Sequence, residues 1–335
     1  GVNNQMLIVN GMLIGRDDAL SASLYEKQQL ALTAMPESLQ KLARYMVPLR
    51  AYNVTGLENV RALLHTDHVT VQEQTLHASH IPSLNDVIDE LAADGKRVIF
   101  TMGKGGVGKT TVAAAIALGL SKRGKKVHLT TTDPAAHLKF VLDETSGISM
   151  SHIDEAKELK KYQSEVLSKA RASGMSDEDI AYVEEDLRSP CTQEIAVFRA
   201  FAEVVERAAD QVVVIDTAPT GHTLLLLEST QSYNREIQRT KGEIPESVKH
   251  LLPRLKSDET EVIIVTLPEA TPFYEARRLE EDLKRTGIAA KWWVVNKSLY
   301  GTNTTNSTLS AKAADEVKWI NRIDQHAGGN FALIA

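Results

Sequence analysis

The glycine-rich segment Gly103–Thr110 carries the clearest chemistry in the sequence. It reads Gly-Lys-Gly-Gly-Val-Gly-Lys-Thr and fits the phosphate-binding pattern G-x-x-x-x-G-K-[ST], the P-loop. Glycines let backbone N–H groups turn onto phosphate oxygens, and a helix that begins there adds the positive end of its dipole. We expect Lys109 to contact the β- and γ-phosphates of ATP and the Thr110 hydroxyl to ligate Mg²⁺. The expected nucleotide contacts are Gly103, Gly105, Gly106, Val107, Gly108, Lys109, Thr110 and Thr111.

A second lysine, Lys104, stands near the start of the same segment. Such a lysine marks the deviant group of Walker A sequences, in which it typically reaches across a dimer to the partner's phosphates. We therefore expect Lys104 to act in catalysis together with Lys109. The alternative is a solvated surface lysine, because isolated charged side chains mostly lie in water.

Two aspartates follow predicted strands and are candidates for the reaction itself. Asp133 is expected to hold the attacking water in line with the γ-phosphate, or else to cap a helix that begins at Pro134. Asp216 is expected to support Mg²⁺ from its strand tip, or else only to cap a turn. The Pro-Thr-Gly segment at 219–221 then predicts a loop that senses hydrolysis.

These residues need a scaffold, and the chain from residue 97 onward predicts one. Its candidate strands are 98–101, 127–132, 212–215, 262–266 and 292–295, all apolar throughout. Strands of this kind are typical of parallel sheets buried on both faces. A helix is expected over 110–123, with Gly124 just past its end, and segments 141–211 and 229–260 predict helical insertions. The fold class is therefore α/β: a P-loop NTPase with a mostly parallel, doubly wound sheet flanked by helices.

A weak internal repeat predicts the domain organisation. Residues 8–13 resemble residues 294–299, and each run is followed by a Leu-Ser-Ala triplet, at 20–22 and 309–311. We interpret 1–65 as the C-terminal part of a first ATPase half whose true beginning lies upstream. Residues 66–95 are expected to be a linker and lead-in helix, with the helix at 84–93. Residues 96–335 are expected to be the second ATPase half, cut at its C-terminus.

Composition excludes several other classes of protein. The formal net charge of −6 gives no electrostatic reason to expect a nucleic-acid partner, which would need a basic face. The single cysteine cannot form an internal disulfide or a thiolate zinc cage, which favours a reducing cytoplasm. No apolar run approaches the length of a membrane span.

Three segments together resemble the arsenical pump-driving ATPase family: Gly103–Thr111, Asp133–Leu138 and above all Asp216–Thr223. That family also includes the ATPases that target tail-anchored proteins, and within it the chain is similar to the tandem bacterial form. The resemblance implies ATP hydrolysis coupled to binding of trivalent arsenic or antimony, As(III) or Sb(III), which energises an arsenite efflux pump. The implied partners are the membrane pump subunit, an arsenite metallochaperone and the missing first ATPase half. The implied location is cytoplasmic, at the inner membrane through the pump.

The resemblance also assigns residues. Asn296 matches the adenine-reading asparagine and Asn10 is its equivalent in the first half, although either could be an ordinary turn asparagine. Ser189, Cys191 and His222 match the second half's contribution to the metalloid site. The first half's P-loop and metalloid-binding cysteines are absent from this sequence.

The cysteine has an independent reading from its neighbours. Ser189 and Pro190 suit the N-cap and first position of a helix, which places Cys191 in the first turn, where the dipole favours a thiolate. Soft metalloids prefer thiolate ligands. The alternative is that Cys191 is a small buried hydrophobic residue.

Two other functions from related classes remain as alternatives. A tail-anchored-protein targeting chaperone is expected to carry a Cys-x-x-Cys pair and a Met-rich groove, whereas this chain has one cysteine and seven scattered methionines. A partition-type deviant P-loop ATPase usually carries a C-terminal amphipathic helix or a basic DNA-binding patch, and nothing comparable is visible in the sequence.

Overall fold

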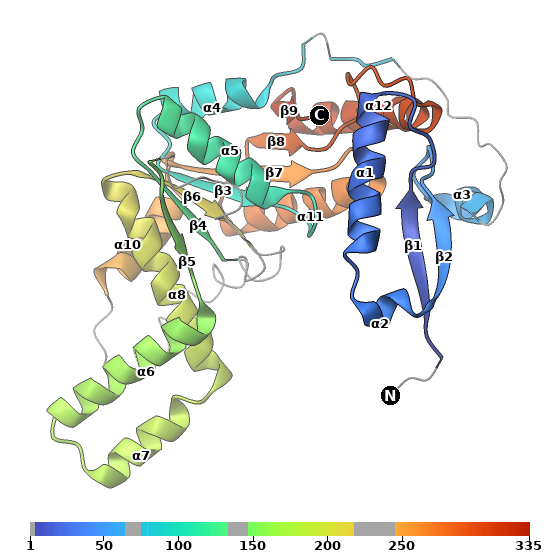
Figure 1. Cartoon of the computed structure of the whole chain (residues 1–335). Coiled ribbons are helices and arrows are strands. Elements are labelled where there is room, and N and C mark those ends of the chain that lie inside the picture. Colours follow the sequence, from blue (N-terminus) through green and yellow to red (C-terminus); the bar gives the residue numbers. More distant parts are fainter. Residues whose placement is uncertain (1–3, 64–74, 79, 133–146, 218–244) are drawn as a thin grey trace.

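The computed structural model describes residues 4–63, 75–78, 80–132, 147–217 and 245–335. Its main sheet has seven strands in the order β5-β4-β6-β3-β7-β8-β9, all parallel (Figure 1). The strands are β3 (Val98–Met102), β4 (Val127–Thr131), β5 (Ser149–His152), β6 (Val212–Asp216), β7 (Thr260–Thr266), β8 (Trp292–Val295) and β9 (Phe331–Leu333). The predicted α/β class is confirmed, and the five predicted strands lie within two residues of the observed ones.

Helices cover both faces of this sheet. On one face, α4 (Leu84–Ala93) and α5 (Lys109–Lys122) pack on residues such as Ile99 and Val214. On the other face, α8 (Pro190–Glu206), α10 (Glu246–Leu255), α11 (Ala270–Thr286) and α12 (Ser307–Ala327) pack on the alternate residues of the strands. Side chains alternate between the two faces of a strand, so continuous apolar strands were the expected solution.

The remaining helices lie outside these two layers. Helices α6 (Glu155–Ala172) and α7 (Asp177–Asp186) form an arm that extends away from the sheet, with α6 packed against α8 (Figure 1). The 3₁₀ helix η3 (Arg207–Ala209) leads into β6. In the part of the chain that the structure describes, no helix is both long and apolar enough to cross a membrane.

Residues 4–63 form a separate two-stranded sheet. Strand β1 (Met6–Met12) pairs in parallel with β2 (Ala43–Pro48). Helices α1 (Ala19–Thr33) and α2 (Glu37–Gln40) connect the two strands, and α3 (Gly56–Leu63) follows β2. The unit β8-α12-β9 has the same strand–helix–parallel strand order. The predicted internal repeat therefore has a structural counterpart.

Strand β5 was not anticipated within residues 141–211, whose described part is otherwise mostly helical, as predicted. It is a short edge strand with the polar sequence Ser-Met-Ser-His, so no apolar run in the sequence indicates a strand here. Its side chains are fixed by His128 of β4, whose two ring nitrogens each lie 2.8 Å from a serine hydroxyl, those of Ser149 and Ser151. Only 1% of His128 is exposed. Burial, with a smaller contribution from Arg207, lowers the pKa of His128 from 6.5 to about 4.

The neutral state of His128 predicts that the fold weakens in mild acid. Because the folded pKa is below the unfolded one, stability is fully present above pH 6.5 and falls as the pH drops toward about 4. The free energy of unfolding should decrease by roughly 2 kcal/mol between pH 6.5 and 5 from this residue. Urea titrations at the two pH values should show a smaller decrease in His128→Gln than in the wild type. His80→Gln, at an exposed histidine, is the control, and equal decreases in wild type and His128→Gln would contradict the prediction.

Candidate functional site

The P-loop lies between the end of β3 and the start of α5, as predicted. Two of its glycines are required by close backbone approach as well as by positive φ. A Cβ on Gly103 (φ 152°) would lie 2.2 Å from the carbonyl oxygen of Val265, and one on Gly108 (φ 92°) would lie 2.3 Å from Nδ2 of Asn296. Any other residue there would push the loop away from its neighbours. The loop is thus held against the carboxyl ends of β7 and β8.

Lys109 sits inside the concave side of this loop. It begins α5 and only 6% of it is exposed, and its ammonium donates to the carbonyl oxygen of Lys104 at 3.2 Å. The N-cap of α5 is Gly108, which has no side chain with which to cap the helix. A positive side chain, a helix N-terminus and glycine backbone meeting at one point suit a polyphosphate.

Thr110 and Asp216 meet beside the loop. The Thr110 hydroxyl donates to Oδ2 of Asp216 at 2.7 Å, and the Thr131 hydroxyl donates to the same oxygen at 3.1 Å. Asp216 ends β6 and is fully buried. A hydroxyl beside a carboxylate offers the oxygen ligands that Mg²⁺ prefers, and Mg²⁺ commonly uses few protein ligands together with substrate phosphates. These residues therefore fit the metal that the P-loop implies.

Lys104 makes an ion pair within the chain. Its ammonium lies 3.3 Å from Oε1 of Glu275 on α11, and the two side chains are 37% and 45% exposed. Exposed pairs of this kind contribute about 0–1 kcal/mol. Lys104 can therefore leave Glu275 for a phosphate at small cost, and the expected reach toward a partner's phosphates stays a prediction.

The side of the loop away from Asp216 is closed by the segment after β8. The amide of Asn296 donates to the carbonyl oxygen of Val107 at 2.8 Å, and the ammonium of Lys297 donates to that of Gly106 at 3.1 Å. Asn296 is 7% exposed. Its amide thus holds the phosphate loop, a contact that the expected adenine-reading role did not include. Asn10, the expected equivalent in the first half, is exposed on β1 of the smaller sheet.

Ser189 and Cys191 open helix α8 as the sequence predicts. Ser189 is the N-cap, accepting from the backbone N–H of Thr192 at 3.4 Å, and Pro190 is the first helical residue. Cys191 is a free, exposed thiol in the first turn. The alternative that it is a buried hydrophobic residue is therefore wrong. A shallow hollow next to it is lined by Tyr182, Glu185, Asp186, Arg188 and Ser189.

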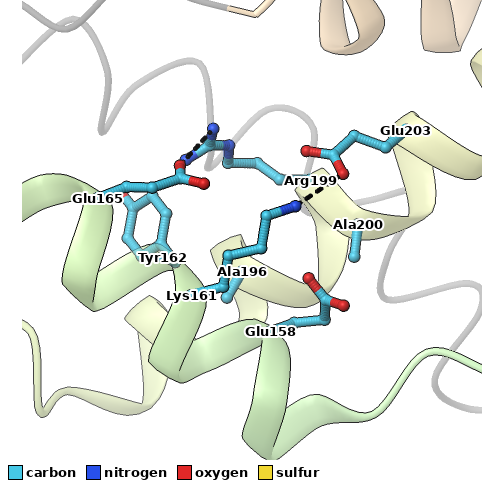
Figure 2. A pocket seen from close by; sticks show the side chains of 8 residues that line it. All are labelled: Glu158, Lys161, Tyr162, Glu165, Ala196, Arg199, Ala200 and Glu203. Carbon is cyan, nitrogen blue, oxygen red and sulfur yellow. Dashed lines mark hydrogen bonds and ion pairs between the residues drawn. The ribbon is translucent and has the colours of Figure 1, made fainter.

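The groove between α6 and α8 is filled by its own charged side chains (Figure 2). Lys161 pairs with Glu203 at 3.0 Å, and Arg199 pairs with Glu165 at 3.1 Å while lying 5.1 Å from the ring centroid of Tyr162. These contacts brace α8 against the arm. The groove is therefore a support for the helix that carries Cys191 rather than a cavity for a ligand.

Two expected site residues, Asp133 and His222, lie outside the described residues, as does the loop at 219–221. Among the residues that are described, no three His, Cys, Asp or Glu side chains gather closely enough to hold a metal ion. Glu275 was missed by reasoning from sequence. Its ion pair joins α11 to the P-loop, which lies far away in the chain, so no local pattern could have indicated it.

Comparison with known proteins agrees with this geometry. The profile of the family described as "Anion-transporting ATPase" matches residues 96–257 and 242–328. An "Arsenical pump-driving ATPase" of Escherichia coli is 40% identical over 341 residues, which is all of this chain and 58% of that protein. A protein of the same name from Acidiphilium multivorum is 38% identical, with the same coverage. A protein from Aquifex aeolicus is 33% identical over 268 residues, covering 69% of this chain and 89% of that protein.

The matches to the Escherichia coli and Acidiphilium multivorum proteins extend over both sheets, and the family profile covers the P-loop site. The chain spans about 58% of the length of the first two of these relatives. The chain belongs to the anion-transporting ATPase family.

Proposed function

We propose that this chain binds and hydrolyses ATP at the P-loop. The observation that carries the proposal is the meeting of Lys109, Thr110 and the buried Asp216 at the tips of β3 and β6. Two elements, the start of α5 and the end of β6, bring a cation, a hydroxyl and a carboxylate together. A phosphate-binding turn without hydrolytic function has no need of the buried carboxylate.

Each residue has a role in this reaction. Lys109 and the N-terminus of α5 hold the phosphates and stabilise their charge, and Lys104 adds a second cation when it leaves Glu275. Thr110 and Asp216 hold Mg²⁺, which when bound neutralises charge on the β- and γ-phosphates. Asp133 is assigned to orient the attacking water, as inferred from its sequence position. Asn296 keeps the loop in place and is assigned to the adenine from the resemblance.

We further propose that hydrolysis is coupled to As(III) or Sb(III) and energises a membrane arsenite efflux pump. The relatives' name, "Arsenical pump-driving ATPase", supports this. So does the exposed thiol of Cys191 at the start of α8, with Ser189 beside it and His222 assigned from the resemblance. An exposed thiol in the first turn of a helix is accessible to a soft metalloid, as a buried one would not be.

Helix α8 supplies a path from that thiol to the nucleotide site. Ten residues beyond Cys191 along the chain, the ring of Phe201 stacks on Phe100, with centroids 6.0 Å apart. Phe100 belongs to β3, which runs directly into the P-loop. A displacement of α8 on metalloid binding would therefore act on the strand that carries the loop.

The wider organisation follows as part of the same proposal. Residues 1–65 are the end of a first ATPase half, 66–95 a linker and lead-in helix, and 96–335 a second half. The partners are that first half, the pump subunit and an arsenite metallochaperone, with the ATPase held at the inner membrane through the pump.

Titration of the ATPase rate of the full-length protein with antimonite tests this proposal. The wild type should be activated several-fold to about a hundredfold, the range of ordinary allosteric coupling. Cys191→Ser should keep the basal rate and lose most of the activation, because the hydroxyl is a poor ligand for a soft metalloid. Glu194→Ser, at an exposed residue of the same helical turn, is the control. The same activation curve for Cys191→Ser and wild type would reject the metalloid role and leave ATP hydrolysis standing.

A further inference from the structure

The segment from 296 to 306, between β8 and α12, is fixed at both ends. At its start it contacts the P-loop through Asn296 and Lys297, as described above. At its end Asn306 caps α12, accepting from the backbone N–H of Leu309 at 3.1 Å. We refer to residues 296–306 as the β8–α12 loop. A contact that fixes the far end of this loop therefore also restricts the segment that contacts the P-loop.

The start of the β8–α12 loop is held by a buried glutamate of α12. Oε2 of Glu316 accepts from the Ser298 hydroxyl and from the N–H of Leu299, both at 2.8 Å, and Glu316 is only 2% exposed. The corresponding unit β1-α1-β2 has a similar hydrogen bond, because Gln28 of α1 accepts from the N–H of Leu13 at 3.0 Å. Each unit therefore fixes the loop after its first strand by a side chain of its own helix.

The far end of the β8–α12 loop is held by Asp18, the N-cap of α1 in the unit β1-α1-β2. Its Oδ2 accepts from the Thr304 hydroxyl at 2.5 Å and from the N–H of Thr305 at 2.6 Å. Its Oδ1 accepts from the N–H of Ser21 at 2.8 Å and so caps α1. The hydrogen bonds from Thr304 and Ser21 hold the pKa of Asp18 well below its usual range. One carboxylate thus serves the N-terminus of α1 and the approach to α12 together.

Neighbouring contacts extend this junction. The amide of Asn306 donates to Oδ2 of Asp17 at 2.7 Å. A Cβ on Gly15 would lie 2.5 Å from the same amide nitrogen, so the two loops approach as closely as glycine allows. A second junction joins Asn53 to the buried Asp315 of α12 at 2.7 Å. The β8–α12 loop and α12 therefore form hydrogen bonds with residues more than 250 positions away in the sequence.

The order of the strands shows which part of a nucleotide faces this loop. Asp216 and Thr110 mark the Mg²⁺ and γ-phosphate side, on β6. The sheet continues in the order β6-β3-β7-β8, so the β8–α12 loop is on the opposite side of the P-loop. Ligands of such sheets lie outside the carboxyl ends of the strands. A nucleotide with its γ-phosphate toward β6 extends its ribose and base toward β7 and β8.

We propose that Asp18 is a positioning residue for the nucleoside part of the bound nucleotide, acting through Thr304 and Thr305 on the β8–α12 loop. The inference rests on the proposed function, since it concerns the same P-loop site. It adds that the loop on the nucleoside side of the site is held by a carboxylate from residues 4–63. Loss of that carboxylate should weaken binding of the base and ribose and leave binding of the phosphates unchanged.

The variant Asp18→Asn separates the two roles of this side chain. Asparagine caps helices about as well as aspartate, so α1 keeps its start. Its amide nitrogen cannot accept from the donors of Thr304 and Thr305. Calorimetry on the whole chain should show Mg-ATP affinity reduced roughly fivefold or more, with Mg-tripolyphosphate affinity unchanged. Asp154→Asn, the same change at the N-cap of the distant helix α6, should alter neither.

A second pair of variants covers the case in which Asp18→Asn fails to fold. Thr304→Val removes the hydroxyl that donates to Asp18 and accepts from the N–H of Asn306 at 3.3 Å, whereas Thr304→Ser keeps a hydroxyl at this position. The first variant should weaken Mg-ATP binding alone, and the second should keep wild-type affinity. Equal losses for Mg-ATP and Mg-tripolyphosphate, or no loss for either, would overturn the positioning role. A wild-type chain that binds neither ligand would instead refute the proposed nucleotide site, a distinct result.

Discussion

Replacement of Lys109 by alanine should weaken Mg-ATP binding to this chain by about a hundredfold or more. Lys109 is 6% exposed and its ammonium donates to the carbonyl oxygen of Lys104 within the P-loop. Charge-assisted hydrogen bonds to phosphate contribute about 1.5–3 kcal/mol each, and Lys109 is placed to make two. The effect should be present with and without Mg²⁺, because the lysine acts on the phosphates directly. Isothermal titration with ATP in magnesium and in EDTA measures both.

A control for Lys109 exists on the same helix. Lys122 is the exposed last residue of α5, so Lys122→Ala removes an equal charge from the far end of the helix. Its ATP affinity should match that of the wild type. Wild-type affinity in Lys109→Ala, with the fold intact by circular dichroism, would show that ATP does not bind at the P-loop.

Sequence reasoning succeeded where a local pattern has one physical explanation. The five predicted strands are apolar runs that must be buried on both faces of a sheet, and the structure buries all of them. The P-loop was identifiable because its glycines, lysine and threonine have fixed spacing between a strand and a helix. The start of α8 was identifiable from Ser189 and Pro190, an N-cap followed by a proline that needs no N–H donor.

Sequence reasoning failed where a role depends on a distant partner. Strand β5 is polar, and besides its parallel pairing with β4 its serine hydroxyls contact the buried His128. Nothing in the local sequence of Asp18 distinguishes an ordinary N-cap from one that also holds a loop 286 residues further along the chain. Lys104 pairs with Glu275 on α11, a contact that the sequence did not indicate, while its assignment to a partner's phosphates stays a prediction. Such contacts are set by the packing of whole elements, which local patterns do not encode.

Asp216→Asn should produce a different defect from Lys109→Ala. ATP should still bind, but Mg²⁺ should no longer strengthen that binding as it does in the wild type. The substitution keeps the shape of a fully buried side chain that accepts from the hydroxyls of Thr110 and Thr131. It removes the negative charge that favours Mg²⁺ at this strand tip. ATP in EDTA should bind at least as tightly as to the wild type, because a carboxylate that repels phosphate has gone. Added Mg²⁺ should then tighten binding much less than in the wild type.

The effect of Asp216→Asn on turnover should be large, because charge on the transferred phosphoryl group would lose part of its stabilisation. We expect hydrolysis by the full-length protein to fall by about 10²–10³-fold, typical for loss of one preorganised electrostatic contact. Asp210→Asn is the matched control, since Asp210 is exposed and lies just before the opposite end of β6. In magnesium titrations, the ATP affinity and the turnover of Asp210→Asn should depend on Mg²⁺ as they do in the wild type. If Asp216→Asn kept a wild-type magnesium response in both, the carboxylate would serve only to tie β6 to Thr110 and Thr131. The metal would then have to be held by other residues.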